Sequence, residues 1–329
     1  MAAGVNAELV QLGDVDELIR HLDRLCAAGD WDGVIEVRSL SRAALERGHQ
    51  LWPVAAHAEY RLALEAPGPF AASTLVTGSG RFALGPIPEV AAARHTWAEL
   101  APHAPPGPTA ALAGHERVVR GEDLTGDDRI LPGVLDVPLV LQPWEPRYPV
   151  ADYQAHEAAF PTPVVGKLEE VELSRRAHQS IRDADAEAAL LDLVSPWTDE
   201  SNGRAEARSV RGDALDAIAV FGRERARVAR IDPPLALAVM AWTAASGGAH
   251  GRRRGMAPGR FAAWWAAAAL AGLGDDWPPD PDALGEAIDD LRWWLWDPGT
   301  ADAGWSCRIA VDDPHDGLAW ALTAVDTIA

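Results

Sequence analysis

The residues best suited to chemistry lie in one short stretch, 246–260, which reads SGGAHGRRRGMAPGR. Its glycines, Gly248 and Gly251 among them, allow a positive φ and a close approach of the backbone to a ligand. Its basic side chains supply donors of the kind that hold phosphate and carboxylate groups. They are His250, Arg252, Arg253, Arg254 and Arg260. This composition predicts an anion-binding loop, with a small anion or a nucleotide as its ligand.

A helix start beside this loop would strengthen the site. If Pro258 opens the next helix, the free amides and the dipole of that helix point at the same place as the arginines. The glycine spacing differs from the nucleotide patterns GxGxxG and GxxxxGKS/T. The loop therefore predicts an anionic ligand without a nucleotide signature, and the sequence identifies no cofactor.

Other interpretations of the loop stay open. The segment 275–329 carries two arginines against thirteen Asp and Glu residues, so the loop arginines could instead neutralise carboxylates within the protein through bidentate pairs. The loop could also dock a partner. The positive field of the arginines favours a neutral imidazole at His250, and a neutral imidazole can act as a base.

A second cluster, DDPHDG at 312–317, combines aspartates with His315, residue types that bind divalent metals. The same residues suit an ordinary helix start, with Asp313 as the cap and Pro314 in the first turn. No complete ligand set accompanies them, so we expect a helix there and no metal site. Ser201 lies outside a GxSxG elbow, and the chain has no HExxH, so no catalytic residues are identified.

Composition excludes several classes of function. The net charge of -20 and a pI of about 4.8 oppose general binding of nucleic acid, which needs a positive face. The longest apolar runs are too short to cross a bilayer, and the chain starts without a secretory signal. Cys26 and Cys307 lack disulfide or zinc spacing. We therefore expect free thiols in a cytoplasmic protein. Lys167 is the single lysine, and this preference for arginine indicates a bacterium with a GC-rich genome.

The first part of the chain, 1–121, shows helical periodicity. Apolar residues recur every three or four positions from Leu12 to Leu25, and Gly29 ends that helix. Further helices are expected at 30–48, 53–65, 88–105 and 107–124. Short turns between them indicate αα-hairpins, so we expect a helical interaction domain that could contact a protein partner.

The middle segment, 122–166, is rich in proline, which disfavours helix and favours extended chain. Its apolar content is too high for a free linker. We expect a connector that packs on the surface and that could contribute an edge strand.

The last part, 167–329, mixes both element types and predicts an α+β domain with a small antiparallel or mixed sheet. One hairpin is expected from 188–197 and 204–212, and a second from 292–296 and 305–311. The remaining elements expected are a strand at 225–231 and helices at 213–221, 235–246, 258–273, 282–291 and 313–329. The arginine loop would join two buried helices.

Tryptophan is concentrated in this last part, with ten of the fourteen after Lys167. Most should belong to the core. Adjacent tryptophans cannot both point inward from one regular element, which makes Trp264 and Trp293 candidates for exposure to a groove.

These observations predict a binding or regulatory protein with an anion-binding loop in its C-terminal domain. One alternative is an enzyme that acts on a phosphorylated or carboxylated small molecule, with His250 as base and the arginines as clamp. Another is a scaffold protein in which the loop is purely structural.

Overall fold

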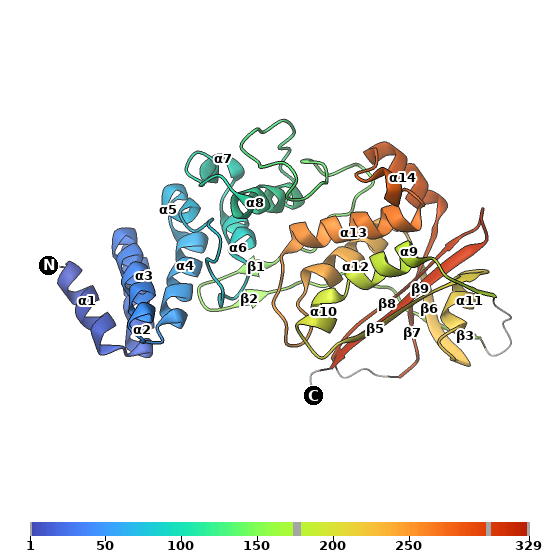
Figure 1. The fold of residues 1–329 in the computed structure, drawn as a ribbon, viewed down its shortest axis with the longest axis horizontal. Helices are drawn as coiled ribbons and strands as arrows, with labels where there is room; N and C mark the ends of the chain where they lie inside the picture. Colours follow the sequence, from blue (N-terminus) through green and yellow to red (C-terminus); the bar gives the residue numbers. More distant parts are fainter. Residues whose placement is uncertain (1, 174–178, 301–303, 328–329) are drawn as a thin grey trace. The chain divides into compact units, whose positions relative to one another are not determined.

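The computed structural model describes residues 2–173, 179–300 and 304–327, and the chain divides into two compact units (Figure 1). Unit 1 comprises Met1–Leu135 and Val150–Phe160, and unit 2 comprises Asp136–Pro149 and Pro161–Ala329. The chain therefore enters unit 2 briefly before it completes unit 1. The predicted α+β class, helical in its first part and with an antiparallel sheet in its last, is confirmed. In the described ranges, no helix is long and apolar enough to cross a bilayer.

Unit 1 is built from helices and one short hairpin. Its helices are α1 (Ala2–Leu12), α2 (Val15–Ala28), α3 (Trp31–Glu46), α4 (Trp52–Glu65), α5 (Gly68–Ala72), α6 (Ile87–Arg94), α7 (Trp97–Leu100) and α8 (Pro108–Val119). Its hairpin pairs β1 (Asp152–Tyr153) with β2 (Ala158–Ala159) in antiparallel register. This hairpin is the only regular structure in the proline-rich segment 122–166, all of which is described.

Local signals set the boundaries of the first helices. The Asp14 side chain accepts a hydrogen bond from the amide of Glu17 at 3.0 Å and caps α2, which ends at Gly29 with a φ of 68°. The Asp30 carboxylate accepts from the amide of Gly33 at 3.0 Å and caps α3. Pro53 stands in the first turn of α4, where a missing amide hydrogen costs nothing.

The expected helix over 88–105 is wrong as a single element. It divides at His95 into α6 and α7, because Thr96 adopts an extended backbone and forms a capping box with Glu99. Helices α1 and α5 were not predicted from the sequence. The core of the first four helices is aliphatic, with Leu18, Leu22, Val34 and Leu62 fully buried.

Unit 2 is built around a seven-stranded antiparallel sheet. The strands are β3 (Glu169–Glu172), β4 (Gln179–Ile181), β5 (Arg204–Arg211), β6 (Arg225–Ile231), β7 (Arg292–Asp297), β8 (Gly304–Asp313) and β9 (Leu318–Thr327). Their order is β3-β6-β7-β8-β9-β5-β4. The predicted pairing of 292–296 with 305–311 is confirmed, with Leu295 opposite Ile309.

Helices cover both faces of this sheet (Figure 1). Helices α9 (Ala184–Asp192), α12 (Pro233–Ala245) and α13 (Met256–Leu270) belong to one layer, and α11 (Ala214–Ala219) packs on the opposite face. The remaining helices of the unit are α10 (Ser195–Asp199), the 3-10 helix η1 (Gly274–Asp276) and α14 (Pro281–Asp290).

Two sequence predictions in unit 2 are wrong. The segment 188–197, expected as a strand, forms the end of α9 and the start of α10, so it does not pair with β5 as a hairpin. The segment expected as the closing helix forms a turn and then β9, which pairs with β8 from Asp313 opposite Leu318. Because the sheet is covered on both faces, β9 is apolar on both of its sides and lacks the alternation that marks a half-buried strand.

The adjacent tryptophans of β7 point to opposite faces of the sheet. Trp293 donates its indole hydrogen to the carbonyl of Ile288, and Trp294 donates to the carboxylate of Asp312, both at 3.0 Å. Trp293 and Trp264 are fully buried, so the suggestion that they face a groove is wrong.

Candidate functional site

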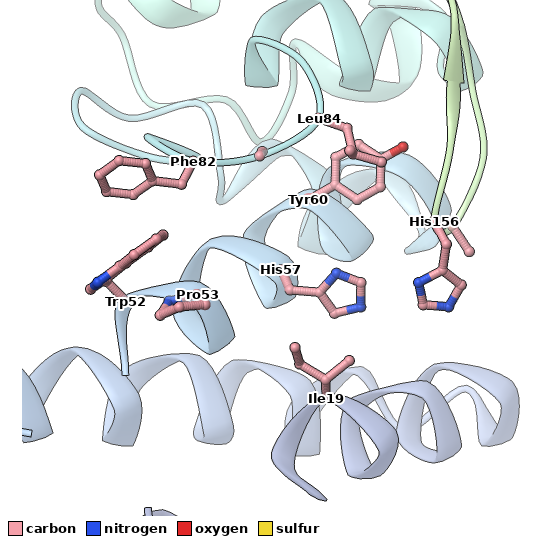
Figure 2. Close-up of a pocket in the computed structure, with 10 residues that line it drawn as sticks. Ile19, Trp52, Pro53, His57, Tyr60, Phe82, Leu84 and His156 are labelled. Carbon is pink, nitrogen blue, oxygen red and sulfur yellow. The ribbon is translucent and has the colours of Figure 1, made fainter. Parts of the chain in front are cut away.

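Unit 1 contains a pocket between helices α2 and α4, the loop before α6, and the tip of the β1–β2 hairpin (Figure 2). Its volume is about 250 Å³. The lining residues are Ile19, Trp52, Pro53, His57, Tyr60, Phe82, Ala83, Leu84, Ala155 and His156. One end of this pocket is aromatic and the other carries two imidazoles, a combination that can hold a molecule with one apolar and one polar end.

Helix α4 supplies one wall because its pocket residues share a face. Pro53, His57 and Tyr60 are separated by four and three positions, the spacing that aligns side chains along a helix. Ile19 comes from α2, and Figure 2 shows it on the side of the His57 ring opposite Leu84. Helices α2 and α4, which pack against each other, thus form the base of the site.

The aromatic end is open to solvent. The Trp52 and Phe82 rings lie with centroids 4.1 Å apart at an interplanar angle of 47°. Trp52 is 39% exposed, Phe82 46% and Leu84 45%. Large apolar side chains that gather in an exposed concave site are typical of ligand-binding surfaces. This end of the pocket is therefore suited to an apolar ring.

The polar end depends on the hairpin, whose tip carries His156. The Tyr60 hydroxyl donates a short hydrogen bond to the carbonyl of Gln154, next but one to His156. Arg94 donates to the carbonyl of Tyr153 at 2.9 Å, and the Tyr153 hydroxyl donates to Glu89 at 2.6 Å. Three contacts with α4 and α6 thus fix the hairpin and bring His156 opposite His57.

A carboxylate lies beside the two imidazoles. The Oδ1 atom of Asp23, on α2, is 3.6 Å from Nε2 of His57 and 3.4 Å from Nε2 of His156. The two rings are nearly parallel, with centroids 5.4 Å apart. Arg61 donates to the same Asp23 oxygen and also pairs with Glu65 at 2.8 Å. In the described part of the chain, Asp23, His57 and His156 are the group of possible metal ligands whose donor atoms all lie within 4.8 Å.

Burial controls protonation at this end. Desolvation lowers the pKa of His57, and the charge of Arg61 lowers it further, so His57 is neutral at pH 7. Desolvation also raises the pKa of Tyr60 to about 12, so its hydroxyl keeps the proton that it donates to the hairpin. The polar end therefore offers a neutral nitrogen donor at His57 and a hydroxyl, that of Tyr60, which is already engaged.

The arginine loop lies in unit 2 and is held by contacts within that unit. Gly248 has a φ of 70°, and the next amide, that of Ala249, donates to the buried carboxylate of Asp326. The amide of His250 donates to the Ser201 hydroxyl at 3.1 Å. Arg254 pairs with Glu200 at 3.0 Å. The acidic segment 275–329 thus contacts this loop through the Asp326 side chain, which accepts a hydrogen bond from the loop backbone.

Arg260 is buried, whereas Arg252 and Arg254 are exposed. Its guanidinium forms a bidentate pair with Glu145 at 2.6 and 2.7 Å and donates to the carbonyls of Pro138 and Val140. Glu145 also accepts from the Trp264 indole at 3.0 Å. Arg260 therefore anchors 136–149 to α13. Anion binding by the whole predicted set stays a prediction; the set is His250, Arg252, Arg253, Arg254, Arg260, Gly248 and Gly251.

The DDPHDG cluster comprises the last two residues of β8 and the turn that leads to β9. The Asp313 carboxylate accepts from the amides of His315 and Asp316 at 2.7 and 3.2 Å. The helix start expected at Asp313 is therefore wrong, because the carboxylate closes a hairpin turn and strand β9 follows.

Sequence reasoning missed the pocket of unit 1. The spacing of Pro53, His57 and Tyr60 was a usable signal for one helix face. Asp23 and His156 carry no such signal, because His156 follows His57 by almost a hundred positions and reaches it only through the hairpin.

Fold and site define a two-unit α+β protein with a pocket in its helical unit. The chain belongs to a family of unknown function, DUF6183, which matches residues 16–328. That range contains every residue that lines the pocket. No curated protein and no solved structure matches the chain.

Proposed function

We propose that this chain is a binding protein whose helical unit takes a small aromatic molecule with one polar group. The observation that carries the proposal is the pairing, in one cavity, of the exposed Trp52, Phe82 and Leu84 with the imidazoles of His57 and His156. The aromatic residues would stack on or enclose the ring of the ligand, and the imidazoles would hold its polar group.

The volume of the pocket limits the ligand. Pockets for drug-sized molecules measure roughly 300 to 1,000 Å³, and an apolar cavity of about 150 Å³ is enough for benzene. A pocket of about 250 Å³ therefore suits one ring or two fused rings. A ring that bears a carboxylate, such as 2-naphthoate, combines this size with a group that histidines can hold.

The lining supports binding in preference to covalent catalysis. Among the residues that line the pocket, Tyr60 is the one with a hydroxyl, and that hydroxyl donates to the carbonyl of Gln154. The lining contains no serine, threonine or cysteine to act as a nucleophile. We therefore keep the role expected from the sequence, binding or regulation, and propose a site in unit 1 for it.

A fluorescence titration with 2-naphthoate tests this proposal. Leu84→Ala and Leu131→Ala form a matched pair, because the two leucines are 45% and 44% exposed and only Leu84 lines the pocket. If the ligand covers the exposed part of Leu84, its loss costs about 1 kcal/mol, or roughly fivefold in Kd. We expect Leu131→Ala to bind as the wild type does. Absence of saturable binding, or equal weakening in both variants, contradicts the proposal.

A further inference from the structure

The geometry at the polar end of the pocket points to a metal site. We propose that Asp23, His57 and His156 together bind one divalent transition-metal ion, with Zn²⁺ as the best match. The placement of its open coordination position toward the pocket rests on the proposed function, whereas the metal site itself rests on these three side chains.

The distances between donor atoms fit a shared ion better than they fit hydrogen bonds. Nitrogen and oxygen ligands at about 2.0 to 2.1 Å from a tetrahedral Zn²⁺ lie about 3.3 to 3.4 Å from each other. Asp23 Oδ1 is 3.6 Å from Nε2 of His57 and 3.4 Å from Nε2 of His156. Both values exceed the 2.7 to 3.2 Å that is usual for an N–H···O bond. The buried Nε2 of His57 has no hydrogen-bond partner, and a metal ion would satisfy it.

The charges around the site tolerate a cation. Arg61 is shared between Asp23 and Glu65, so one guanidinium serves two carboxylates and the three groups together carry a net negative charge. The hydrogen bond and ion pairs of Asp23 all involve Oδ1. This oxygen faces both imidazoles, and Arg61 orients the carboxylate as an outer partner does in many metal sites.

The donor set selects the type of metal. Two imidazoles and one carboxylate suit Zn²⁺ and related transition metals, whereas Ca²⁺ and Mg²⁺ prefer oxygen ligands throughout. Three protein ligands leave one tetrahedral position for water or a ligand. Because His57 and His156 both line the pocket, that position would face the polar group of a bound aromatic molecule.

Calorimetric titration of the metal-free full chain with Zn²⁺ alone tests the site, on protein expressed without a polyhistidine tag. We expect one equivalent to bind. The key variant is His156→Ala, in which an exposed side chain is truncated, and we expect affinity to fall roughly tenfold or more. Asp23→Asn should weaken binding as well. His103→Ala is the matched control, an exposed histidine outside the cluster, and should bind as the wild type does.

Co²⁺ provides a second measurement, because its visible absorption bands report ligand number and should change with His156→Ala. Absence of Zn²⁺ binding by folded wild type, or equal loss in His103→Ala and His156→Ala, overturns the metal site. Zn²⁺ binding without 2-naphthoate binding supports the metal site and contradicts the proposed function. Naphthoate binding without Zn²⁺ binding does the reverse. If both bind, Zn²⁺ should tighten naphthoate binding in the wild type and leave it unchanged in His156→Ala.

Discussion

The buried ion pair between Arg260 and Glu145 makes Arg260→Met the most informative change in unit 2. The two side chains are 1% and 0% exposed. Methionine fills much of the same volume, but it leaves the Glu145 carboxylate buried without its counter-charge and the carbonyls of Pro138 and Val140 without their donor. Loss of one partner from a buried pair costs about 3 to 5 kcal/mol.

Arg254→Met is the matched control for this change. The pair of Arg254 with Glu200 is exposed, at 44% and 45%, and such pairs contribute about 0 to 1 kcal/mol. Urea unfolding followed by circular dichroism at neutral pH should separate the two variants by at least about 2 kcal/mol in the free energy of unfolding. Equal stability losses in both variants would refute the structural role assigned to Arg260.

The pH dependence of Arg260→Met gives a further check. Burial by itself raises the pKa of Glu145, but hydrogen bonds and charge from Arg260 outweigh this, so in the wild type the pKa lies below 4.5. The stability that this pair provides is therefore present above pH 4.5 and is lost as the pH falls through the lowered pKa. Without Arg260, burial raises the pKa of Glu145 above 4.5. The deficit of the variant should then shrink as the pH falls from neutral to about 5, and a deficit independent of pH would contradict this explanation.

Three further predictions concern the buried cysteines and the packing around Gly259. Burial raises the pKa of the Cys26 and Cys307 thiols from 9.0 to about 11, so neither should react with Ellman's reagent at about pH 8 until the protein is unfolded. Because the folded state favours the neutral thiol, the stability of the wild type should fall as the pH rises from 9 toward 11, and Cys307→Ala should fall less steeply. In Gly259→Ala, a Cβ would overlap the carbonyl oxygen of Ala241 on the adjacent helix, and we expect a loss of about 1 to 3 kcal/mol in thermal or urea unfolding. Gly4→Ala, at a helical glycine with open space around it, should be neutral or stabilising by up to about 1 kcal/mol, and the reverse order of these two variants would contradict the packing of α12 on α13.

Local signals predicted much of the fold. Gly29 ends α2 as the sequence indicates, and Arg292 begins the strand that pairs with β8. The prediction failed where tertiary context decides the structure. The segment after Gly317 has no period of two because both faces of β9 are buried, and it was therefore interpreted as a helix.

The candidate site was harder to predict than the fold. The arginine loop attracted attention because its residues are contiguous, yet Arg260 pairs with Glu145, more than a hundred positions earlier in the chain. The residues of the pocket in unit 1, in contrast, lie far apart in the sequence. His57 and His156 each stand alone in segments without a motif, and the contacts of the hairpin with α4 and α6 bring them together. No pattern in a single sequence predicts that two such distant histidines lie close together.

The most direct test of the pocket is the nuclear magnetic resonance spectrum of the fourteen tryptophan indole N–H groups during titration with 2-naphthoate. We predict that the Trp52 signal, assigned by its loss in Trp52→Phe, shifts saturably. The signals of Trp264 and Trp293, which are buried in unit 2, should remain in place. A Trp52 signal that does not move while tryptophans of unit 2 shift would contradict the assignment of the ligand site to the helical unit.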